Sequence, residues 1–350
     1  MRNQGVDIAR FIAFTGMVLV NFRIAAEVTT GGGWGGADVG ADWALDWPAT
    51  LTGYLEGRAA ALFVVLAGVG VALGAAPWHL TLRRALFLFV IGMADMLIFD
   101  ADILHFYAFY FLVAMVFMGR SNRALLLGAA GFVGIGTLAQ ALLNYEAGWN
   151  WDTLSYADFW TLPGFLRHTF YNGWHPVFPW AGFLLFGMYL GRLKLDRVPV
   201  QLILLAGGGA VALASELLSR QLIELPEWGE LLGTTPIPPG PLYMVAAGAW
   251  ATAALGLILL ITPLIRFLRI ELLLIAPGRM TLTLYAAHIL IGMGLLQGLG
   301  LLGGQMSSLE IFTYSIAFVA CAALFALVWL RKFRRGPLEA LMRILTEGKT

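Results

Sequence analysis

Apolar segments of 18 residues or more recur along the whole of this 350-residue chain. A helix needs about 20 such residues to cross the ~30 Å hydrocarbon layer of a membrane. The composition agrees, because 59% of the residues are hydrophobic and only 12% are charged, whereas soluble domains have about 25% charged residues. The sequence therefore predicts an all-α protein, a polytopic bundle of transmembrane helices.

We expect about ten spans, each helical, because backbone groups inside a membrane must be satisfied within their own segment. The predicted spans cover residues 7–24, 55–76, 82–99, 102–119, 124–143, 175–192, 198–217, 241–262, 279–301 and 308–330. Glycines such as those of LAGVGVALG (66–74) are expected to let helices approach closely. No repeat or second domain is evident, so residues 1–350 are predicted to form one domain. Residues 331–350 form its tail, a short amphipathic helix on the cytoplasmic face.

Charge asymmetry predicts the orientation of these spans. Basic clusters fall on one side of the ten-span arrangement, at Arg83/Arg84, Arg120/Arg123, Arg192/Lys194/Arg197, Arg266/Arg269 and Arg331/Lys332/Arg334/Arg335. The opposite loops are acidic, with Asp38, Asp42 and Asp46, then Asp152 and Asp158, then Glu224, Glu227 and Glu230. Positively charged loops stay in the cytoplasm, so both termini are expected there.

Several classes of function find no support in the composition. The single cysteine, Cys321, cannot form an intrachain disulfide. The chain has no basic patch with interleaved aromatic residues, and no Cys/His spacing or carboxylate cluster typical of a metal site. We therefore expect neither nucleic acid nor a metal as a partner.

Polar residues inside the first span define a candidate site. Arg10 and Asn21 are eleven residues apart, which in a helix places them on one face, about 16 Å from each other. Asp7 lies one turn before Arg10 and can form an i,i+3 ion pair that only anchors the helix. Alternatively, Arg10 binds a phosphate or a thioester carbonyl. Ionisable groups at membrane depth are costly, so each is a functional hypothesis.

Two sets of polar residues are candidates for acid–base chemistry at the opposite membrane face. Asp102 and His105 are three residues apart, and a carboxylate beside an imidazole fixes its tautomer; the alternative is a capping pair at the helix start. His175 opens the sixth span, beside two prolines that make the helix entry irregular, and such entries are tolerated only where protein or water lines them. His168, on the preceding loop, is expected on the surface.

Cationic residues at the cytoplasmic ends are candidates for anion binding. Arg83 and Arg84 begin the third span and Arg279 begins the ninth. Anchoring at the membrane surface explains all three, but the break APG before Arg279 also places an arginine at a helix start, which suits a phosphate. His288 lies about 13 Å deeper than Arg279, with Tyr285 one turn before it, and a buried interhelical hydrogen bond is the alternative role for this histidine.

Six segments, in this order, resemble one family: VDIARFIAFTGMVLVNF, the arginine pair 83–84, DILHFYA, HPVFPWAGFLLFGMYLGR, GRMTLTLYAAH and FRRGPLE. Together they resemble bacterial relatives of heparan-alpha-glucosaminide N-acetyltransferase, within the transmembrane acyltransferase superfamily. The resemblance runs through nearly the whole chain. It implies a multi-pass protein of the bacterial cytoplasmic membrane, surrounded by lipids, and it suggests a homodimer.

The resemblance also implies a reaction. Such proteins take an acyl group from cytoplasmic acyl-CoA, here acetyl-CoA or another acyl-CoA, and pass it to a hydroxyl or amine of an extracytoplasmic sugar or lipid. In the superfamily, the first helix has an arginine, ten intervening residues and a catalytic histidine. This chain keeps the spacing but has Asn21 at the histidine position, and no histidine follows before His79.

The reaction assigns roles to the candidates. Arg83, Arg84 and Arg279, with His288 and Tyr285, would hold the CoA, and Arg10 with Asn21 would polarise the thioester. His175, or His105 with Asp102, would deprotonate the acceptor, because an amide such as Asn21 cannot. A carrier or flippase that moves a small metabolite or lipid through the same polar bundle is the alternative, and a membrane subunit without catalytic activity is a third.

Overall fold

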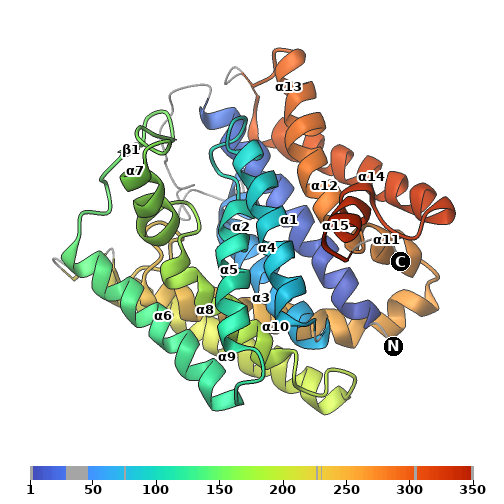
Figure 1. Ribbon diagram of the computed structural model, residues 1–350, viewed down its shortest axis with the longest axis horizontal. Coiled ribbons are helices and arrows are strands. Elements are labelled where there is room, and N and C mark those ends of the chain that lie inside the picture. Colours follow the sequence, from blue (N-terminus) through green and yellow to red (C-terminus); the bar gives the residue numbers. More distant parts are fainter. Residues whose placement is uncertain are drawn as a thin grey trace.

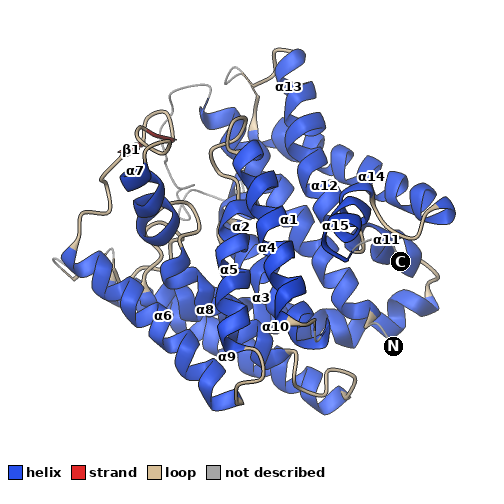
Figure 2. Cartoon of the chain, viewed as in Figure 1, coloured by secondary structure: helices blue, strands red, loops and turns tan. Residues whose placement is uncertain are grey.

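The computed structural model of the protein is helical almost throughout (Figure 2) and describes residues 3–28, 46–74, 76–225, 228–229, 231–302 and 306–347. The predicted all-α class is confirmed. The helices are α1 (Gln4–Val28), α2 (Trp47–Leu55), α3 (Arg58–Gly74), α4 (Trp78–Asp95), α5 (Leu104–Phe117), α6 (Asn122–Leu142), α7 (Leu162–Arg167), α8 (Val177–Leu190), α9 (Val198–Leu222), α10 (Pro241–Phe267), α11 (Glu271–Gly278), α12 (Thr281–Ala287), α13 (Gly294–Gly298), α14 (Ser308–Lys332) and α15 (Pro337–Glu347). Two π-helical turns, η1 (His168–Asn172) and η2 (His288–Met293), and a two-stranded antiparallel hairpin, β1 (Trp149–Asn150) and β2 (Ser155–Tyr156), complete the described elements.

Every predicted span corresponds to a helix or to a pair of consecutive helices. Within the described residues, seven segments are long and apolar enough to cross a membrane, namely α1, α2–α3, α6, α9, α10, α12–α13 and α14. The apolar helices α5 and α8 are shorter, and α4 contains Arg83, Arg84 and Asp95. The protein is thus a multi-pass membrane protein, while ten crossings and the side of each terminus stay predictions.

Three segments predicted as loops contain helices. The predicted loop 25–54 contains α2, which begins where the Asp46 side chain accepts a hydrogen bond from the amide of Ala49 (3.1 Å). The predicted loop 144–174 contains the hairpin, α7 and η1, and the segment between the eighth and ninth predicted spans contains α11, whose last three residues are the APG break. These elements are short, so their sequences lack the repeated apolar period that reveals a long helix.

Helix α1 is the central helix of the bundle. Of its apolar window, 78% of the residues are buried inside the protein, against 11% for α6 at the periphery. In Figure 1, α1 runs between the group formed by α3, α4 and α5 and the group formed by α11 to α15, and it packs on α3, α10, α11 and α14. A polar residue on α1 is therefore enclosed by other helices rather than by lipid.

Glycines set the closest helix contacts, as expected for the run LAGVGVALG. A Cβ atom on Gly68 of α3 would lie 2.1 Å from the carbonyl oxygen of Leu184 in α8. A Cβ atom on Gly187 of α8 would lie equally close to the carbonyl oxygen of Val65. Only glycine permits this approach of two helix backbones, which locks α3 against α8.

The basic segments meet at one end of the bundle. Arg83 and Arg84 contact the end of α15, Arg279 contacts Arg334, and Arg192 contacts the backbone of Arg120. This agrees with the positions that charge asymmetry predicts for these clusters. The loop acids Asp38, Asp42, Glu227 and Glu230 lie outside the described residues.

Candidate active site

Two cavities lie at opposite ends of α1 and α3. The first, the basic cavity, is lined by the start of α1, including Asp7 and Arg10, and by the end of α3. The second, the histidine cavity, is lined by Asn21 in the second half of α1, by the start of α3 and by His175. The predicted stripe on α1 therefore has Arg10 at one cavity and Asn21 at the other, and both face the bundle interior.

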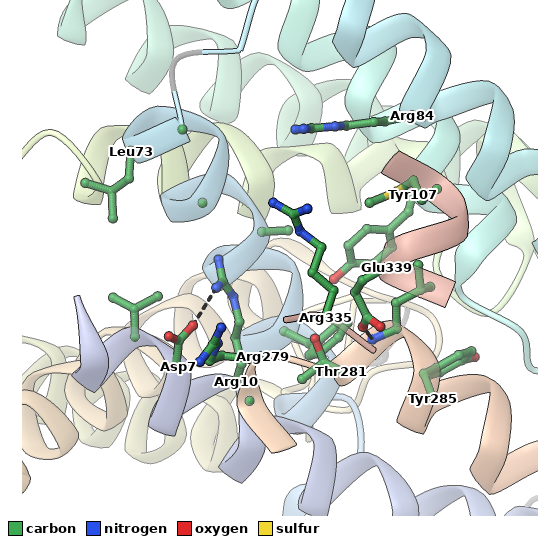
Figure 3. A pocket seen from close by; sticks show the side chains of 18 of the residues that line it. Asp7, Arg10, Leu73, Arg84, Tyr107, Arg279, Thr281, Tyr285, Arg335 and Glu339 are labelled. Carbon is green, nitrogen blue, oxygen red and sulfur yellow. Dashed lines mark hydrogen bonds and ion pairs between the residues drawn. The ribbon is translucent and has the colours of Figure 1, made fainter. Parts of the chain in front are cut away.

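The basic cavity is large, about 1230 Å³, and its walls follow helical spacing. Three helices each present one face, with residues 6, 7 and 10 of α1, residues 63, 67, 70 and 74 of α3, and residues 104, 107 and 111 of α5. Six arginines line it, namely Arg10, Arg84, Arg279, Arg334, Arg335 and Arg343. Figure 3 shows Arg10, Arg84 and Arg335 extending into the same space.

Acidic residues hold several of these arginines in place. Asp7 is buried and accepts from Arg10 at 3.0 Å, so the predicted i,i+3 ion pair is present. Arg84 pairs with Glu347 of α15 at 2.9 Å. Gly70 makes room for the Arg10 guanidinium, because a Cβ atom there would lie 2.6 Å from Arg10 Nη2.

Glu339 of α15 occupies the start of α12. Its Oε1 accepts from the backbone amides of Leu282 (2.9 Å) and Thr283 (3.1 Å), and its Oε2 accepts from the Thr283 hydroxyl (2.5 Å). Burial raises the pKa of the Glu339 carboxyl. The helix start after the APG break is thus already capped by the Glu339 carboxyl group, which leaves the arginine side chains as the anion-binding groups of the cavity.

The deep end of the basic cavity is apolar apart from Arg10 and a tyrosine. Phe63 and Tyr107 lie there with their ring centroids 5.9 Å apart. Phe63 is eleven residues from the C-terminal end of α3 and Tyr107 is ten residues from the C-terminal end of α5. Ten residues are about 15 Å along a helix axis, which is half the thickness of a bilayer core. The hydroxyl of Tyr107 is buried and has no hydrogen-bond partner within the described chain.

The histidine cavity is small, about 40 Å³, and is lined by Asn21, Glu56, Trp174, His175 and Trp180 among others. His175 Nδ1 and Trp180 Nε1 are buried without a partner among the described residues. The two rings meet edge to face, 4.6 Å apart. The Tyr110 hydroxyl fixes the backbone here by donating to the His175 carbonyl at 2.6 Å.

Asn21 and His288 form a buried pair beside the histidine cavity. The Asn21 amide nitrogen lies 3.0 Å from His288 Nε2, and His288 Nδ1 is hydrogen-bonded to the Tyr285 carbonyl. A carbonyl only accepts, so Nδ1 holds the proton and Nε2 of the neutral ring accepts from Asn21. His288 is wholly buried and lines neither cavity, whereas its neighbour Tyr285 lines the basic cavity.

Tyr285 also joins the Asp102–His105 pair. Its hydroxyl accepts from the Ile103 amide (3.1 Å) and donates to Asp102 Oδ1 (3.3 Å). Asp102 Oδ2 lies 3.0 Å from His105 Nδ1 and accepts from the His105 amide. Asp102 and His105 are both wholly buried, and neither lines a cavity.

The sequence predicted His168 on the surface, and this prediction is wrong because the residue is wholly buried. The π-helical turn η1 directs it inward, where its ring stacks 5.7 Å from that of His105. Neither of its ring nitrogens has a partner in the described chain. The segment HTFYN has no apolar period, so no sequence signal placed this turn.

The predicted site residues therefore separate into groups. Arg10, Arg84, Arg279 and Tyr285 line the basic cavity, and Asn21 and His175 line the histidine cavity. Arg83 lies outside both and donates to the Thr346 carbonyl at 2.9 Å. Sequence reasoning missed Tyr107 and Glu339; the spacing of Tyr107 from Leu104 and Phe111 was the signal that could have found the first.

Two family models match the chain. The model described as heparan-alpha-glucosaminide N-acetyltransferase, catalytic, matches residues 2–220. A model described as a protein of unknown function, DUF418, matches residues 195–349. No curated protein matches the chain. The first match includes every residue that lines the histidine cavity except Pro236 and Ile237, and the second includes α12 and α15.

Proposed function

We propose, since the chain belongs to the heparan-alpha-glucosaminide N-acetyltransferase catalytic family, that it is a membrane acetyltransferase with acetyl-CoA as donor. The basic cavity takes the donor from the cytoplasm. The acceptor, a hydroxyl or amine of a sugar or lipid, arrives at the histidine cavity from the other side of the membrane.

The observation that carries this proposal is the basic cavity itself. Acetyl-CoA has a multiply phosphorylated head and a long, nearly uncharged arm that ends in the thioester. Arginine suits phosphate because its planar guanidinium donates two parallel hydrogen bonds. The cavity has arginines on its walls and an apolar deep end at Phe63 and Tyr107. The arginines therefore suit the phosphates of the donor, and the apolar end suits its uncharged arm.

The histidine cavity supplies groups for the acceptor. Removing a proton from an attacking hydroxyl or amine needs a base within hydrogen-bond reach, and His175 has a ring nitrogen without a partner among the described residues. Glu56, also at this cavity, forms an ion pair with Arg23 (3.8 Å) and adds a charged group beside the acceptor. Asn21 keeps its amide on His288 and acts as a positioning group rather than as the base.

Binding and transfer measured on the two membrane faces test the proposal. Purified protein in vesicles is given radiolabelled acetyl-CoA on the face with the basic cavity and an amino sugar on the other. We expect labelled acetyl-sugar to form, and we expect Arg10→Ala to weaken acetyl-CoA binding in calorimetry. Arg123→Ala is the matched control, because Arg123 belongs to the same basic end but does not line the cavity.

His175→Ala separates binding from chemistry. It is expected to abolish transfer while acetyl-CoA binds as in the wild type, because His175 lies at the other cavity. If the wild-type protein binds no acetyl-CoA at millimolar concentration and forms no acetylated product, the acetyltransferase function is wrong. Movement of the sugar or a lipid without any acyl donor would instead support a carrier.

A further inference from the structure

Tyr107 has a hydroxyl group for which the folded chain supplies no partner. The residue is 5% exposed, and no described residue makes a hydrogen bond to its hydroxyl oxygen. Its ring has tilted contacts with the rings of Phe63, Tyr110 and Phe111. In Figure 3, Tyr107 projects into the basic cavity with its hydroxyl toward the arginines.

A phenylalanine would fill the same space without the polar group. A buried hydroxyl without a partner costs about 1–3 kcal/mol, and nearly all buried polar groups in folded proteins are satisfied. The neighbouring tyrosines follow this rule, because Tyr110 donates to His175 and Tyr285 to Asp102. The Tyr107 hydroxyl is thus placed for something that enters the cavity.

The surroundings of this hydroxyl define the chemistry of that ligand. At this depth, Phe63, Leu104 and Phe111 form apolar walls, which suit the uncharged arm and acyl end of a thioester better than a phosphate. Arg10 lines the same cavity and supplies positive charge there. A hydroxyl donor in a cavity that also holds a cation favours a ligand oxygen that gains negative charge.

We propose that Tyr107 is a catalytic residue that donates a hydrogen bond to the carbonyl oxygen of the acyl thioester. This inference rests on the proposed acetyltransferase function and adds a residue that sequence reasoning did not select. The sites fit together, because Tyr107 contacts Tyr110 and Tyr110 holds His175 of the histidine cavity. Tyr107 therefore lies on the side of the basic cavity that faces the acceptor.

The reaction proceeds with Tyr107 keeping its own proton. The acceptor nitrogen or oxygen forms a bond to the carbonyl carbon, and the electron pair of the carbonyl π bond moves to the oxygen that Tyr107 binds. When the carbonyl re-forms, the carbon–sulfur bond breaks and CoA leaves as a thiolate. The proton lost by the acceptor passes first to the base and then to the CoA thiolate. For each acetyl group that the acceptor gains, CoA therefore gains one proton.

Tyr107→Phe tests the proposal directly. Loss of one such donor lowers kcat by about 10²–10³-fold in other enzymes, and we expect a loss of this order with little change in KM for acetyl-CoA. The matched control is Tyr189→Phe, which removes a hydroxyl from α8 at a residue that lines neither cavity. It is expected to transfer acetyl at the wild-type rate.

Infrared spectroscopy provides a readout that does not need turnover. Acetyl-CoA labelled with ¹³C at the carbonyl should show a lowered stretching frequency when bound to the wild type, and a higher one in Tyr107→Phe. Should Tyr107→Phe not fold, replacement of Tyr107 by 3-fluorotyrosine keeps the shape and strengthens the donor, so the frequency should fall further.

Different results would overturn the role of Tyr107 and the proposed acetyltransferase function. Wild-type transfer together with an unchanged kcat in Tyr107→Phe, or an unchanged carbonyl frequency in the tyrosine variants, would overturn the role of Tyr107 and leave the acetyltransferase standing. A wild-type protein that binds no acetyl-CoA would overturn the proposed function. A loss of affinity for both acetyl-CoA and free CoA in Tyr107→Phe, with kcat preserved, would show a binding role and also overturn the proposal.

Discussion

The Asn21 amide nitrogen lies 3.0 Å from Nε2 of His288, two residues 267 positions apart in the sequence. The bond joins the end of the central helix α1 to the π-helical turn η2, inside the bundle and away from water. The Tyr285 carbonyl sets the tautomer of the histidine, and its Nε2 then sets the orientation of the Asn21 amide.

We expect Asn21→Leu to destabilise the protein through this bond. The substitution leaves a buried imidazole nitrogen unpaired, which costs about 1–3 kcal/mol, and the free energy of unfolding in mixed micelles should fall by that amount. His288→Phe in the same chain removes the unpaired nitrogen and should recover part of the loss. A double variant whose loss of stability equals the sum of the two single losses would show that the pair is not coupled.

Gly70→Ala should weaken acetyl-CoA binding without unfolding the protein. The new methyl group would lie 2.6 Å from Arg10 Nη2 and must displace the guanidinium from its position beside Asp7. Because a hydrogen bond to a charged group contributes about 1.5–3 kcal/mol, calorimetry should show a dissociation constant raised by roughly 10- to 100-fold. Gly74→Ala is the control, since Gly74 lines the same cavity and a Cβ atom there meets nothing within 4 Å.

Gly68→Ala should destabilise the contact between α3 and α8. A Cβ atom would lie 2.1 Å from a carbonyl oxygen of α8, so the helices must separate, at a cost of about 1–3 kcal/mol. Gly131→Ala, in α6, meets nothing within 4 Å and should leave the thermal midpoint equal or higher because alanine favours helix. A Gly68→Ala protein as stable as the wild type would contradict the close contact.

The docking of α15 should weaken as the pH rises. Burial raises the pKa of Glu339 above 4.5, so the folded protein favours the protonated carboxyl. The stabilisation is complete below the unfolded pKa and is lost as the pH rises through the raised value. Hydrogen exchange of the α15 amides, corrected for intrinsic rates, should show protection that decreases over this range.

Glu339→Gln is the matched variant for this experiment. Its side-chain oxygen can accept from the amides of Leu282 and Thr283, and its amide can donate to the Thr283 hydroxyl, without a titrating group. Protection of α15 should then be independent of pH. If the glutamine variant keeps the pH dependence of the wild type, another group is responsible.

The helices and the stripe on α1 were predictable because they depend on local spacing. Arg10 and Asn21 are eleven residues apart in any helix, and the buried α1 places both toward the interior as expected. The basic end was predictable for a similar reason, since charged residues cannot remain in the hydrocarbon layer.

Contacts between distant segments were not predictable in this way. The tail was expected to lie as an amphipathic helix on the membrane face, and α15 is a helix, but Glu339 and Glu347 hold it on α12 and α4. Neither partner is signalled by the sequence of the tail. His168 was misplaced because a π-helical turn departs from the 3.6-residue period on which such predictions rest.

The basic and histidine cavities have no lining residue in common within the described chain. The helices around Tyr107, Tyr110 and Trp180 separate them with tightly packed aromatic rings. The proposed acetyl transfer would therefore move a two-carbon group from one side to the other without a passage for ions. Acetylation of an external sugar would then leave the electrical potential and proton gradient of the membrane intact.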